Sequence, residues 1–262
     1  MIYNKIKSDQ ISFVLQGKNI KGQTAKCCKS IRKYFPESEI IFSTYENEDC
    51  GDLDCDLVEK IVDPGATLLS GRMYNNINRI LATTKAGISK ASKEYCCKIR
   101  SDMCFDSDKL LFIYNNFHKR NDMFSIFKQR LVFYQLWSRK YEFLNNKFKI
   151  DCPWYLSDWL CFGYTVDVAR YFNSINFTKE PEFSLFFDNP ENRLCGFFDA
   201  NVKWRFPPEQ YFCTQFFSKY FPEANMKSLQ DFDDEKVQKS REVLVNNVIV
   251  AGYQELGAYV QK

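Results

Sequence analysis

Residues 75–102 read NNINRILATTKAGISKASKEYCCKIRSD. The first part of this stretch has apolar residues at the spacing of one helix face: Ile77, Ile80, Leu81, Ile88 and Ala91. The mostly apolar run 95–99 follows and leads directly into Arg100, Ser101 and Asp102. The stretch therefore predicts an amphipathic helix and then a buried strand whose end carries charged side chains.

Strands and helices also alternate before this stretch. We predict strands over 11–15, 39–43 and 57–62, and a helix over 24–34 that ends before Pro36. This alternation is typical of a parallel sheet with helices on both faces. Such sheets bind ligands at the carboxyl ends of their strands. The residues of interest are those that follow the predicted strands: Gln16, Gly17, Thr44, Tyr45, Asp63, Arg100 and Asp102.

The second part of the chain is more basic and aromatic. Residues 117–149 carry eight Lys or Arg against two acidic residues, with Phe, Tyr and Trp interleaved. We predict two helices within 106–150. Their basic side fits an anionic membrane surface near a lipid-linked acceptor, or the more common case of a solvated face on an ordinary helix pair. Further helices are expected from 167 and from 207, with loops and short strands over 173–206. Residues 235–248 are expected as a helix or as a helix followed by a strand.

Composition excludes several classes of protein. The 262 residues suffice for a core without disulfides or metals, and 45% hydrophobic with 17% aromatic residues excludes a disordered chain. A net charge of +3 is too small to indicate nucleic-acid binding. The 11 cysteines include no Cys-x-x-Cys and His118 is the only histidine, so no zinc site is indicated and reduced, buried thiols are expected.

Several sequence signals are missing as well. No apolar run is long enough for a membrane span or a secretory signal, so we expect a cytoplasmic protein. Neither Gly-x-Gly-x-x-Gly nor the P-loop pattern occurs, which argues against the usual dinucleotide fold and against a P-loop nucleotidase.

Eight short motifs follow one another along residues 11–212: Gln16-Gly17, Phe35-Pro36, 40–44, Asp63-Pro64-Gly65, Asn76-x-Asn78-Arg79, Lys98-x-Arg100-Ser101-Asp102, Ser157-Asp158-Trp159 with Phe162-Gly163, and Pro208-Glu209-Gln210. Together they resemble the WavE family, named for lipopolysaccharide synthesis in Gram-negative bacteria. The helix, strand and acidic residue of 75–102 are similar to the donor half of GT-A nucleotide-sugar glycosyltransferases.

The resemblance implies an α/β, GT-A-like fold. This is a mostly parallel, Rossmann-like sheet flanked by helices, with a helical, aromatic-rich insertion over 106–150. It further implies a single domain over 1–262, in which 11–105 form the donor-binding half and 106–262 the acceptor half.

The activity implied is that of a hexosyltransferase. It would move a sugar from a nucleotide-diphosphate donor, with a UDP-sugar as first choice, to a growing bacterial surface glycan. That acceptor would be lipopolysaccharide or capsule, free or lipid-linked, at the inner face of the cytoplasmic membrane, and no nucleic acid is implied as a partner. The donor-binding residues implied are Gln16, Gly17, Thr44, Tyr45, Asp63, Asn76, Arg79, Arg100 and Asp102.

A departing sugar diphosphate gathers negative charge, which a metal ion or fixed cations must stabilise. Asp102 is the candidate ligand for Mn²⁺ or Mg²⁺, and Arg79 and Arg100 are candidate partners of the diphosphate. Position 100 is Arg where the Asp-x-Asp pattern has its first carboxylate. The motif 106–108 also reads Asp-x-Asp and is an alternative metal site. A local ion pair is the alternative role of Arg100 and Asp102.

Two carboxylates are candidate general bases for the acceptor hydroxyl. Glu209 opens a predicted helix, where it is equally suited to capping, and Asp158 precedes an apolar strand.

Two other functions stay open. The chain could bind nucleotide sugars without catalysis, because one Asp-x-Asp carboxylate is missing. It could also bind nucleic acid through 117–149, in which case oligonucleotide binding would be salt-sensitive.

Overall fold

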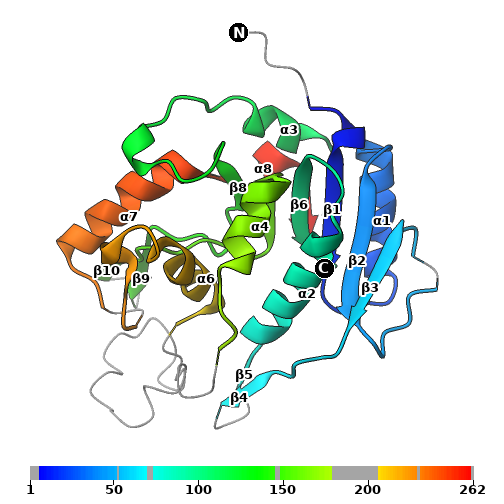
Figure 1. Ribbon diagram of the computed structural model, residues 1–262, viewed down its shortest axis with the longest axis horizontal. Coiled ribbons are helices and arrows are strands. Elements are labelled where there is room, and N and C mark those ends of the chain that lie inside the picture. The colour runs from blue at the N-terminus through cyan, green and yellow to red at the C-terminus, as the bar shows by residue number, and fades with distance from the viewer. Residues whose placement is uncertain are drawn as a thin grey trace.

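The computed structural model describes residues 6–51, 53–69, 73–144, 148–178, 206–228 and 231–260. Within them, seven strands form one sheet in the order β12-β8-β11-β6-β1-β2-β3 (Figure 1). These strands are β1 (Ile11–Gln16), β2 (Glu39–Tyr45), β3 (Leu57–Ile61), β6 (Tyr95–Arg100), β8 (Leu131–Tyr134), β11 (Leu160–Tyr164) and β12 (Val248–Ala251).

Most neighbours in this sheet are parallel. β11 pairs antiparallel with β6 and β8, and the other paired strands of the described sheet run parallel. The predicted fold class, a mostly parallel α/β sheet flanked by helices, is confirmed. Strands from both predicted halves, 11–105 and 106–262, join this sheet, while the division into a donor half and an acceptor half stays a prediction.

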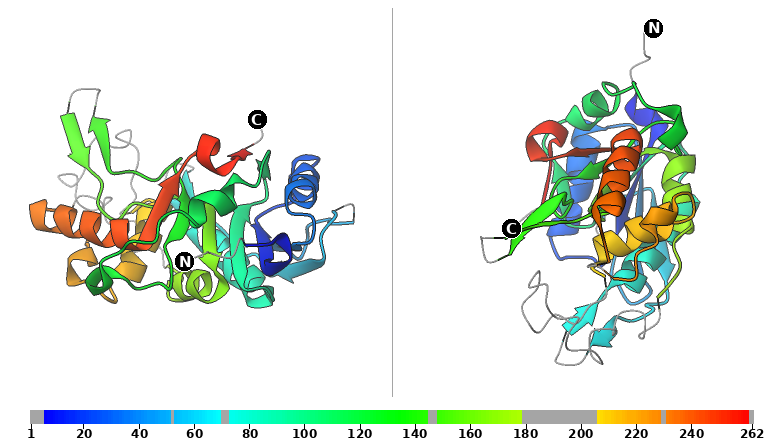
Figure 2. Two further views of the ribbon diagram at one scale, coloured as in Figure 1. Left: turned by 90° about the horizontal axis from the view of Figure 1, so that it is seen from above. Right: turned by 90° about the vertical axis from the view of Figure 1, so that its left-hand side faces the viewer.

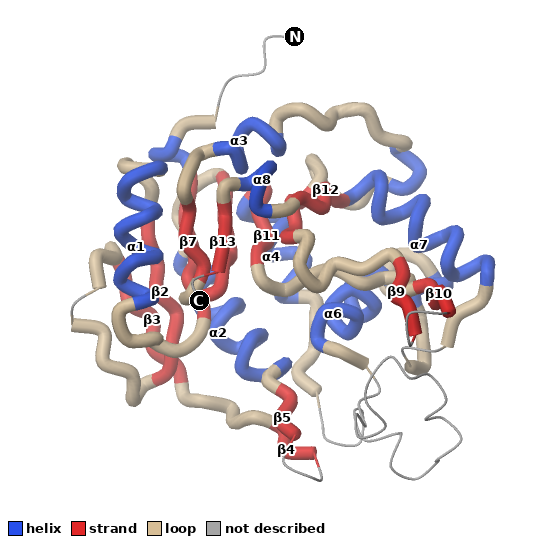
Figure 3. Tube along the Cα trace, turned by 180° about the vertical axis from the view of Figure 1, so that it is seen from behind, coloured by secondary structure: helices blue, strands red, loops and turns tan. Residues whose placement is uncertain are grey.

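Alternate residues of each strand face opposite sides of the sheet, which gives two buried clusters. In β1, Val14 belongs to one cluster, and Phe13 and Leu15 belong to the other. The first face is covered by α2 (Ile77–Lys90), α4 (Thr165–Asn173), α6 (Pro208–Phe217) and α7 (Asp234–Asn247). The second is covered by α1 (Gln23–Tyr34), α3 (Lys109–Tyr114) and α8 (Tyr253–Leu256), as the view from behind shows (Figure 3). Figure 2 shows these helices on either side of the sheet.

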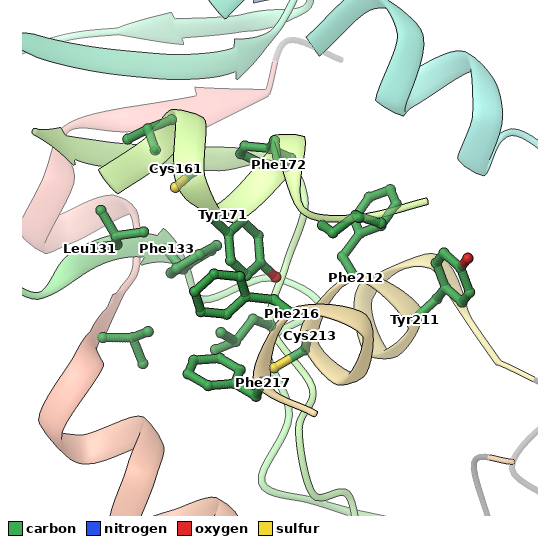
Figure 4. Packing of buried hydrophobic residues seen from close by; sticks show 14 of the residues in the cluster. Leu131, Phe133, Cys161, Tyr171, Phe172, Tyr211, Phe212, Cys213, Phe216 and Phe217 are labelled. Carbon is green, nitrogen blue, oxygen red and sulfur yellow. The ribbon is translucent and has the colours of Figure 1, made fainter. Parts of the chain in front are cut away.

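Aromatic side chains fill much of the first cluster (Figure 4). Tyr171 of α4 lies with its ring centroid 5.0 Å from that of Phe216 of α6, and Phe133 of β8 lies 5.5 Å from Tyr171. Helix α6 is buried on most sides, because five of its last seven residues, 211–217, are apolar or aromatic. This packing fixes α6, and with it the position of Glu209 in the first turn.

The segment 106–150 differs from the prediction of two helices. Its described part has one α-helix of six residues, α3, together with the 3-10 turn η2 (Asp122–Phe124) and the strands β8, β9 (Tyr141–Leu144) and β10 (Phe148–Asp151). The helical insertion was therefore wrong. β8 pairs with β11 and β12, which are distant in the sequence, and such pairing overrides local helical spacing.

The basic and aromatic residues of this segment do not form one surface. β8 crosses the sheet, so the chain before it lies at the amino ends of the parallel strands and the chain after it at their carboxyl ends. Exposed apolar side chains lie on both sides: Phe112, Phe117 and Met123 before β8, and Leu136, Trp137 and Tyr141 after it.

The remaining described elements are short: η1 (Ser8–Gln10), β4 (Thr67–Leu69), β5 (Met73–Asn75), β7 (Met103–Phe105), η4 (Pro222–Ala224) and β13 (Ala258–Val260). The predicted helices after 167, 207 and 235 correspond to α4, α6 and α7. Most of the predicted loops over 173–206 lie outside the described residues. No helix in the described ranges is both long and apolar enough to cross a bilayer.

Candidate functional site

A cavity of about 380 Å³ opens at the carboxyl ends of β1, β2 and β6, beside the start of α2. We call it the polar cavity. It lies where ligands bind parallel sheets. It is lined by Gln16, Gly17, Lys18, Ile20, Tyr45, Asn76, Arg79, Ile80, Arg100, Ser101, Asp102 and Asp158. Most of the residues predicted from the sequence for donor binding therefore come together in one place.

The floor of the cavity is the turn after β1. Gly17 has a φ of 120°, a conformation that side chains with a Cβ rarely adopt, and its N–H donates to the Ser43 carbonyl at 3.1 Å. The Ser101 hydroxyl donates to the Lys18 carbonyl at 2.7 Å, and the Ser101 N–H donates to the Gln16 carbonyl at 3.1 Å. The turns after β1 and β6 are thus fastened to each other.

Arg100 is held against Asp102. Its Nε and Nη2 donate to the two carboxylate oxygens at 2.9 and 2.6 Å, and its guanidinium lies 4.1 Å from the centre of the Trp159 ring. This two-point geometry is the strong form of an arginine–carboxylate pair. The ion pair that was the alternative role of these residues is present, and it presents the guanidinium to the cavity in a fixed orientation.

Arg79 is held in the same manner by Asp63. Its Nε and Nη2 donate to the carboxylate oxygens at 2.8 and 2.5 Å. The hydrogen bonds from Arg79 lower the pKa of Asp63, and the Gly65 N–H adds a further bond to that carboxylate at 2.9 Å. Asp63 does not itself line the cavity, and it contributes by orienting Arg79. Asn76, at the start of α2, also accepts from Arg79 at 3.4 Å.

The residues present do not fit a divalent ion held by the protein alone. Asp102 is 7% exposed, and both of its oxygens already accept from Arg100. Among the described residues, no three His, Cys, Asp or Glu side chains gather around a common point. Asp106 of the alternative motif accepts from the Tyr253 hydroxyl at 2.5 Å, away from the cavity lining. The described side chains therefore do not offer Mn²⁺ or Mg²⁺ a complete set of ligands.

The two candidate bases lie near each other. Asp158, which is 5% exposed, lines the cavity just before β11. Glu209 is half-buried in the first turn of α6 and outside the lining. Burial, together with the negative charge of Asp158, raises the pKa of Glu209 to about 8, while the positive charge of Arg139 opposes that rise. A carboxyl group that titrates near neutral pH is suited to proton transfer.

Beneath Asp158 lies a fully buried cation. The Lys98 ammonium donates to the Asp158 backbone carbonyl, and burial lowers the pKa of Lys98 to about 8. The sequence motif around Arg100 includes Lys98 and indicates no role for it. The available signal was a lysine inside an otherwise apolar strand, a position that a charged side chain occupies only with a partner.

Thr44 was predicted at the site and does not line the cavity, whereas Lys18 lines it and was not predicted. Thr44 is fully buried in β2, and its hydroxyl has no hydrogen-bond partner among the described residues, whereas its neighbour Tyr45 reaches the cavity. Burial raises the pKa of Tyr45 to about 12. Lys18 lines the cavity and was not singled out from the sequence. Lys18 directly follows Gly17 beyond the end of a predicted strand, and this position could have indicated that it lies at the site.

The fold and this cavity define an α/β protein with a cation-lined site at the carboxyl edge of a mostly parallel sheet. The model of the family described as WavE lipopolysaccharide synthesis matches residues 11–262, so the chain belongs to that family. Its role therefore lies in lipopolysaccharide synthesis.

No curated protein matches the chain. Among solved structures, the chain is similar to 4-diphosphocytidyl-2C-methyl-D-erythritol synthase from Anaerococcus prevotii DSM 20548. The two share 12% identity at a TM-score of 0.36, over 70% of this chain and 85% of that one. This likeness is too distant to bear on function.

Proposed function

We propose that the chain is a glycosyltransferase of lipopolysaccharide synthesis. It moves a sugar from a nucleotide-diphosphate donor, with a UDP-sugar as first choice, to the growing glycan. The observation that carries this proposal is the polar cavity, which combines three cations, Lys18, Arg79 and Arg100, with the carboxylates of Asp102 and Asp158. Glu209 lies close enough to Asp158 for their charges to interact.

In this proposal the cations compensate the charge of the diphosphate. Asp63 and Asp102 hold the two guanidinium groups at the cavity wall, so little side-chain freedom is lost when the donor binds. Planar guanidinium groups suit phosphate oxygens, and their positive charge stabilises the departing nucleoside diphosphate. Because the protein side chains do not fit a divalent ion by themselves, we expect the arginines to supply the main charge compensation.

The carboxylate pair performs the proton transfer. The acceptor hydroxyl gives its proton to Glu209 while its oxygen bonds to the anomeric carbon of the donor. The bond between that carbon and the diphosphate breaks, and its electron pair stays on the phosphate oxygen. Burial, and then the charge of Asp158, raise the pKa of Glu209, so that Glu209 holds the proton more strongly than an ordinary carboxylate.

The first test is a thermal-shift screen of nucleoside diphosphates and sugar nucleotides, each with Mn²⁺ and with EDTA. A ligand at 100 times its dissociation constant adds about 2.7 kcal/mol of stability. We expect one nucleoside diphosphate to stabilise the protein, and most of this effect to survive EDTA. Loss of the effect with EDTA would instead favour Asp102 as a metal ligand. No response to any nucleotide contradicts the proposed function.

The variant R79Q/R100Q is expected to lose the nucleotide response. The matched control is Arg32→Gln, because Arg32 pairs with Asp56 at 2.8 Å and does not line the polar cavity.

A second candidate function, donor binding without transfer, is favoured by the ion pair at Asp102, where a metal ligand was expected. Incubation with the stabilising sugar nucleotide and deacylated lipopolysaccharide separates the two. A mass increase of one sugar supports transfer, and binding without such an increase supports the second candidate.

A further inference from the structure

A second and larger cavity, of about 870 Å³, lies beside β8, β12 and α7. Its volume is in the range of small-molecule sites, roughly 300–1,000 Å³. It shares no lining residue with the polar cavity. Its apolar floor includes Leu156, Val237 and Val248. The proposed proton transfer and donor binding make no use of it.

The second cavity runs along β12, from Val248 to Gly252, and reaches the edge of the sheet where the polar cavity lies. β8 and β12 run in the same direction as β6, because both β6 and β8 are antiparallel to β11 and β12 is parallel to β8. The carboxyl ends of β8 and β12 lead into Gln135 and Gly252, which line the second cavity. β11 lies between β8 and β6 in the sheet. Its first residues therefore lie at this edge, between the two cavities.

The carboxylate pair occupies this boundary. Asp158 precedes β11 and lines the polar cavity. Glu209 interacts electrostatically with Asp158 on one side and with Arg139, a lining residue of the second cavity, on the other. The neighbouring Gln210 donates to the carbonyl of Pro153, at 3.0 Å, and Pro153 also lines the second cavity. The chain from Leu156, which lines the second cavity, to Asp158, which lines the polar cavity, therefore connects the two.

We propose that the second cavity binds the glycan acceptor, and that this acceptor is an anionic saccharide carrying a phosphate or carboxylate group. The inference rests on the proposed function. Three cations line the cavity, Arg139, Lys140 and Arg241. Guanidinium groups bind phosphate and carboxylate through two parallel hydrogen bonds, and apolar floors suit the C–H faces of sugar rings.

Two acidic residues, Glu242 and Glu255, also line this cavity, so its lining carries three cations against two carboxylates, and each carboxylate accepts a hydrogen bond from a neighbouring donor. Glu242 accepts from the Gln238 amide at 2.8 Å, and Glu255 accepts from the Gly252 N–H at 3.0 Å. Arg241 donates to Asp151 at 2.6 Å, which positions its guanidinium at the rim. A neutral glycan would gain little from this set of cations, whereas an anionic one would gain charge-assisted hydrogen bonds.

The test measures binding of three matched trisaccharides by isothermal titration. The probes are maltotriose, maltotriose with a terminal phosphate, and trigalacturonic acid. We expect the charged probes to bind more tightly than maltotriose, by about tenfold, the value of one charge-assisted hydrogen bond. The phosphate and uronate arms then show which anion is preferred. Equal binding of all three, or no binding of the charged probes, overturns the proposal.

Variants assign the binding to this cavity. K140Q/R241Q should lose the preference for the charged probes and keep its response to the nucleoside diphosphate. Val245→Trp provides a second block, because Val245 lines the cavity and is 61% exposed, so a larger side chain there does not disturb the core. R79Q/R100Q should lose the response to the nucleoside diphosphate and keep the preference for the charged trisaccharides. Absence of nucleotide binding by the wild-type protein would contradict the proposed function and not this inference. Unchanged trisaccharide binding by K140Q/R241Q and by Val245→Trp would contradict this inference and not the proposed function.

Discussion

Glu209 carries the clearest pH signature of the site. Its pKa in the folded chain is raised from 4.5 to about 8, first by burial and then by Asp158. Between these values the folded chain keeps a proton that the unfolded chain has released. The stabilisation that the protonated Glu209 side chain gives to the folded chain is therefore complete at low pH and is lost as the pH rises toward 8.

We predict that Glu209→Gln removes this pH dependence. The neutral amide resembles the protonated acid, so the variant should become more stable relative to wild type as the pH rises from 5 to 8. The slope of the difference is at most about 1.4 kcal/mol per pH unit, which corresponds to one proton. Urea unfolding at pH 5 to 8.5 measures it, with Glu37→Gln, an exposed position, as control. An unchanged difference across this range would contradict the raised pKa.

The same residue governs the predicted rate. If Glu209 accepts the proton of the acceptor, sugar transfer should increase with pH and level off above about 8. Glu209→Gln should reduce transfer strongly at every pH and leave nucleotide binding intact. A variant that transfers sugar at the wild-type rate would assign the base to Asp158 or to another group.

Arg100 and Asp102 are predicted to behave as a coupled pair. Arg100→Gln leaves the nearly buried Asp102 without its two-point partner, and we expect a loss of about 1–3 kcal/mol in the free energy of unfolding. The double variant R100Q/D102N should recover part of this loss, because an amide needs less compensation than a carboxylate. Chemical denaturation of the four proteins in the cycle measures the coupling. Additive effects would mean that the pair is energetically unimportant.

At the scale of elements, α2 depends on a close approach to the sheet. A Cβ on Gly87 would lie 2.4 Å from Cγ1 of Val14 in β1 and 2.9 Å from Cβ of Ser43 in β2. Neither atom is the end of a long flexible side chain. Glycine at this position therefore allows α2 to lie against both strands, and α2 carries Asn76 and Arg79 at its start to the cavity.

We predict that Gly87→Ala destabilises the protein. Overpacking in a core costs about 1–3 kcal/mol, and the better helix propensity of alanine returns about 1 kcal/mol of this. The melting temperature should fall by a few degrees. Gly51→Ala is the control, since its Cβ would meet only the Asp49 carboxylate at 3.6 Å. An equal or higher melting temperature for Gly87→Ala would show that α2 can shift away from the sheet.

Most elements of residues 11–105 could be predicted from the sequence, whereas β8 in the second part of the chain could not. Strands β1, β2, β3 and β6 and helices α1 and α2 were expected close to their observed bounds, because periodicity and turn residues mark each of them locally. The strand ends then led to most of the polar cavity. β8 was missed, because periodicity does not separate a buried strand from a helix segment in a run of only four apolar residues, 131–134, and only their partners in β11 and β12 decide between the two.

The arginine pairs show the corresponding limit for the site. The sequence indicated that Arg79 and Arg100 approach a diphosphate, with an ion pair to Asp102 as the alternative role of Arg100. The pairing of Arg79 with Asp63 was not indicated, because the two residues are 16 positions apart and meet only in the fold. The coupling of Glu209 to Asp158 was equally hidden, because it depends on how α6 packs beside the start of β11.

At the scale of the whole molecule, both cavities reach the same edge of the sheet. The basic and aromatic stretch 117–149 was predicted to belong to a helix pair whose basic side faces a membrane or solvent, and β8 instead divides this stretch between opposite edges of the sheet. Leu136, Trp137 and Tyr141 lie on the edge that carries the cavities, next to Arg139 and Lys140. If a lipid-linked acceptor reaches the second cavity from an anionic membrane, this edge must face the lipid, and the apolar residues before β8 must face away from it.

This arrangement predicts a directional membrane contact. The variant L136S/Y141S removes two exposed apolar side chains from the cavity edge and should weaken sedimentation with phosphatidylglycerol vesicles by about tenfold. F112S/M123S removes two even more exposed side chains from the opposite edge and should leave binding unchanged. Vesicles of phosphatidylcholine should bind less, because the basic residues beside Leu136 then have no anionic partner. The reverse pattern of the two variants would turn the cavities away from the membrane, and the acceptor would have to reach the second cavity from solution.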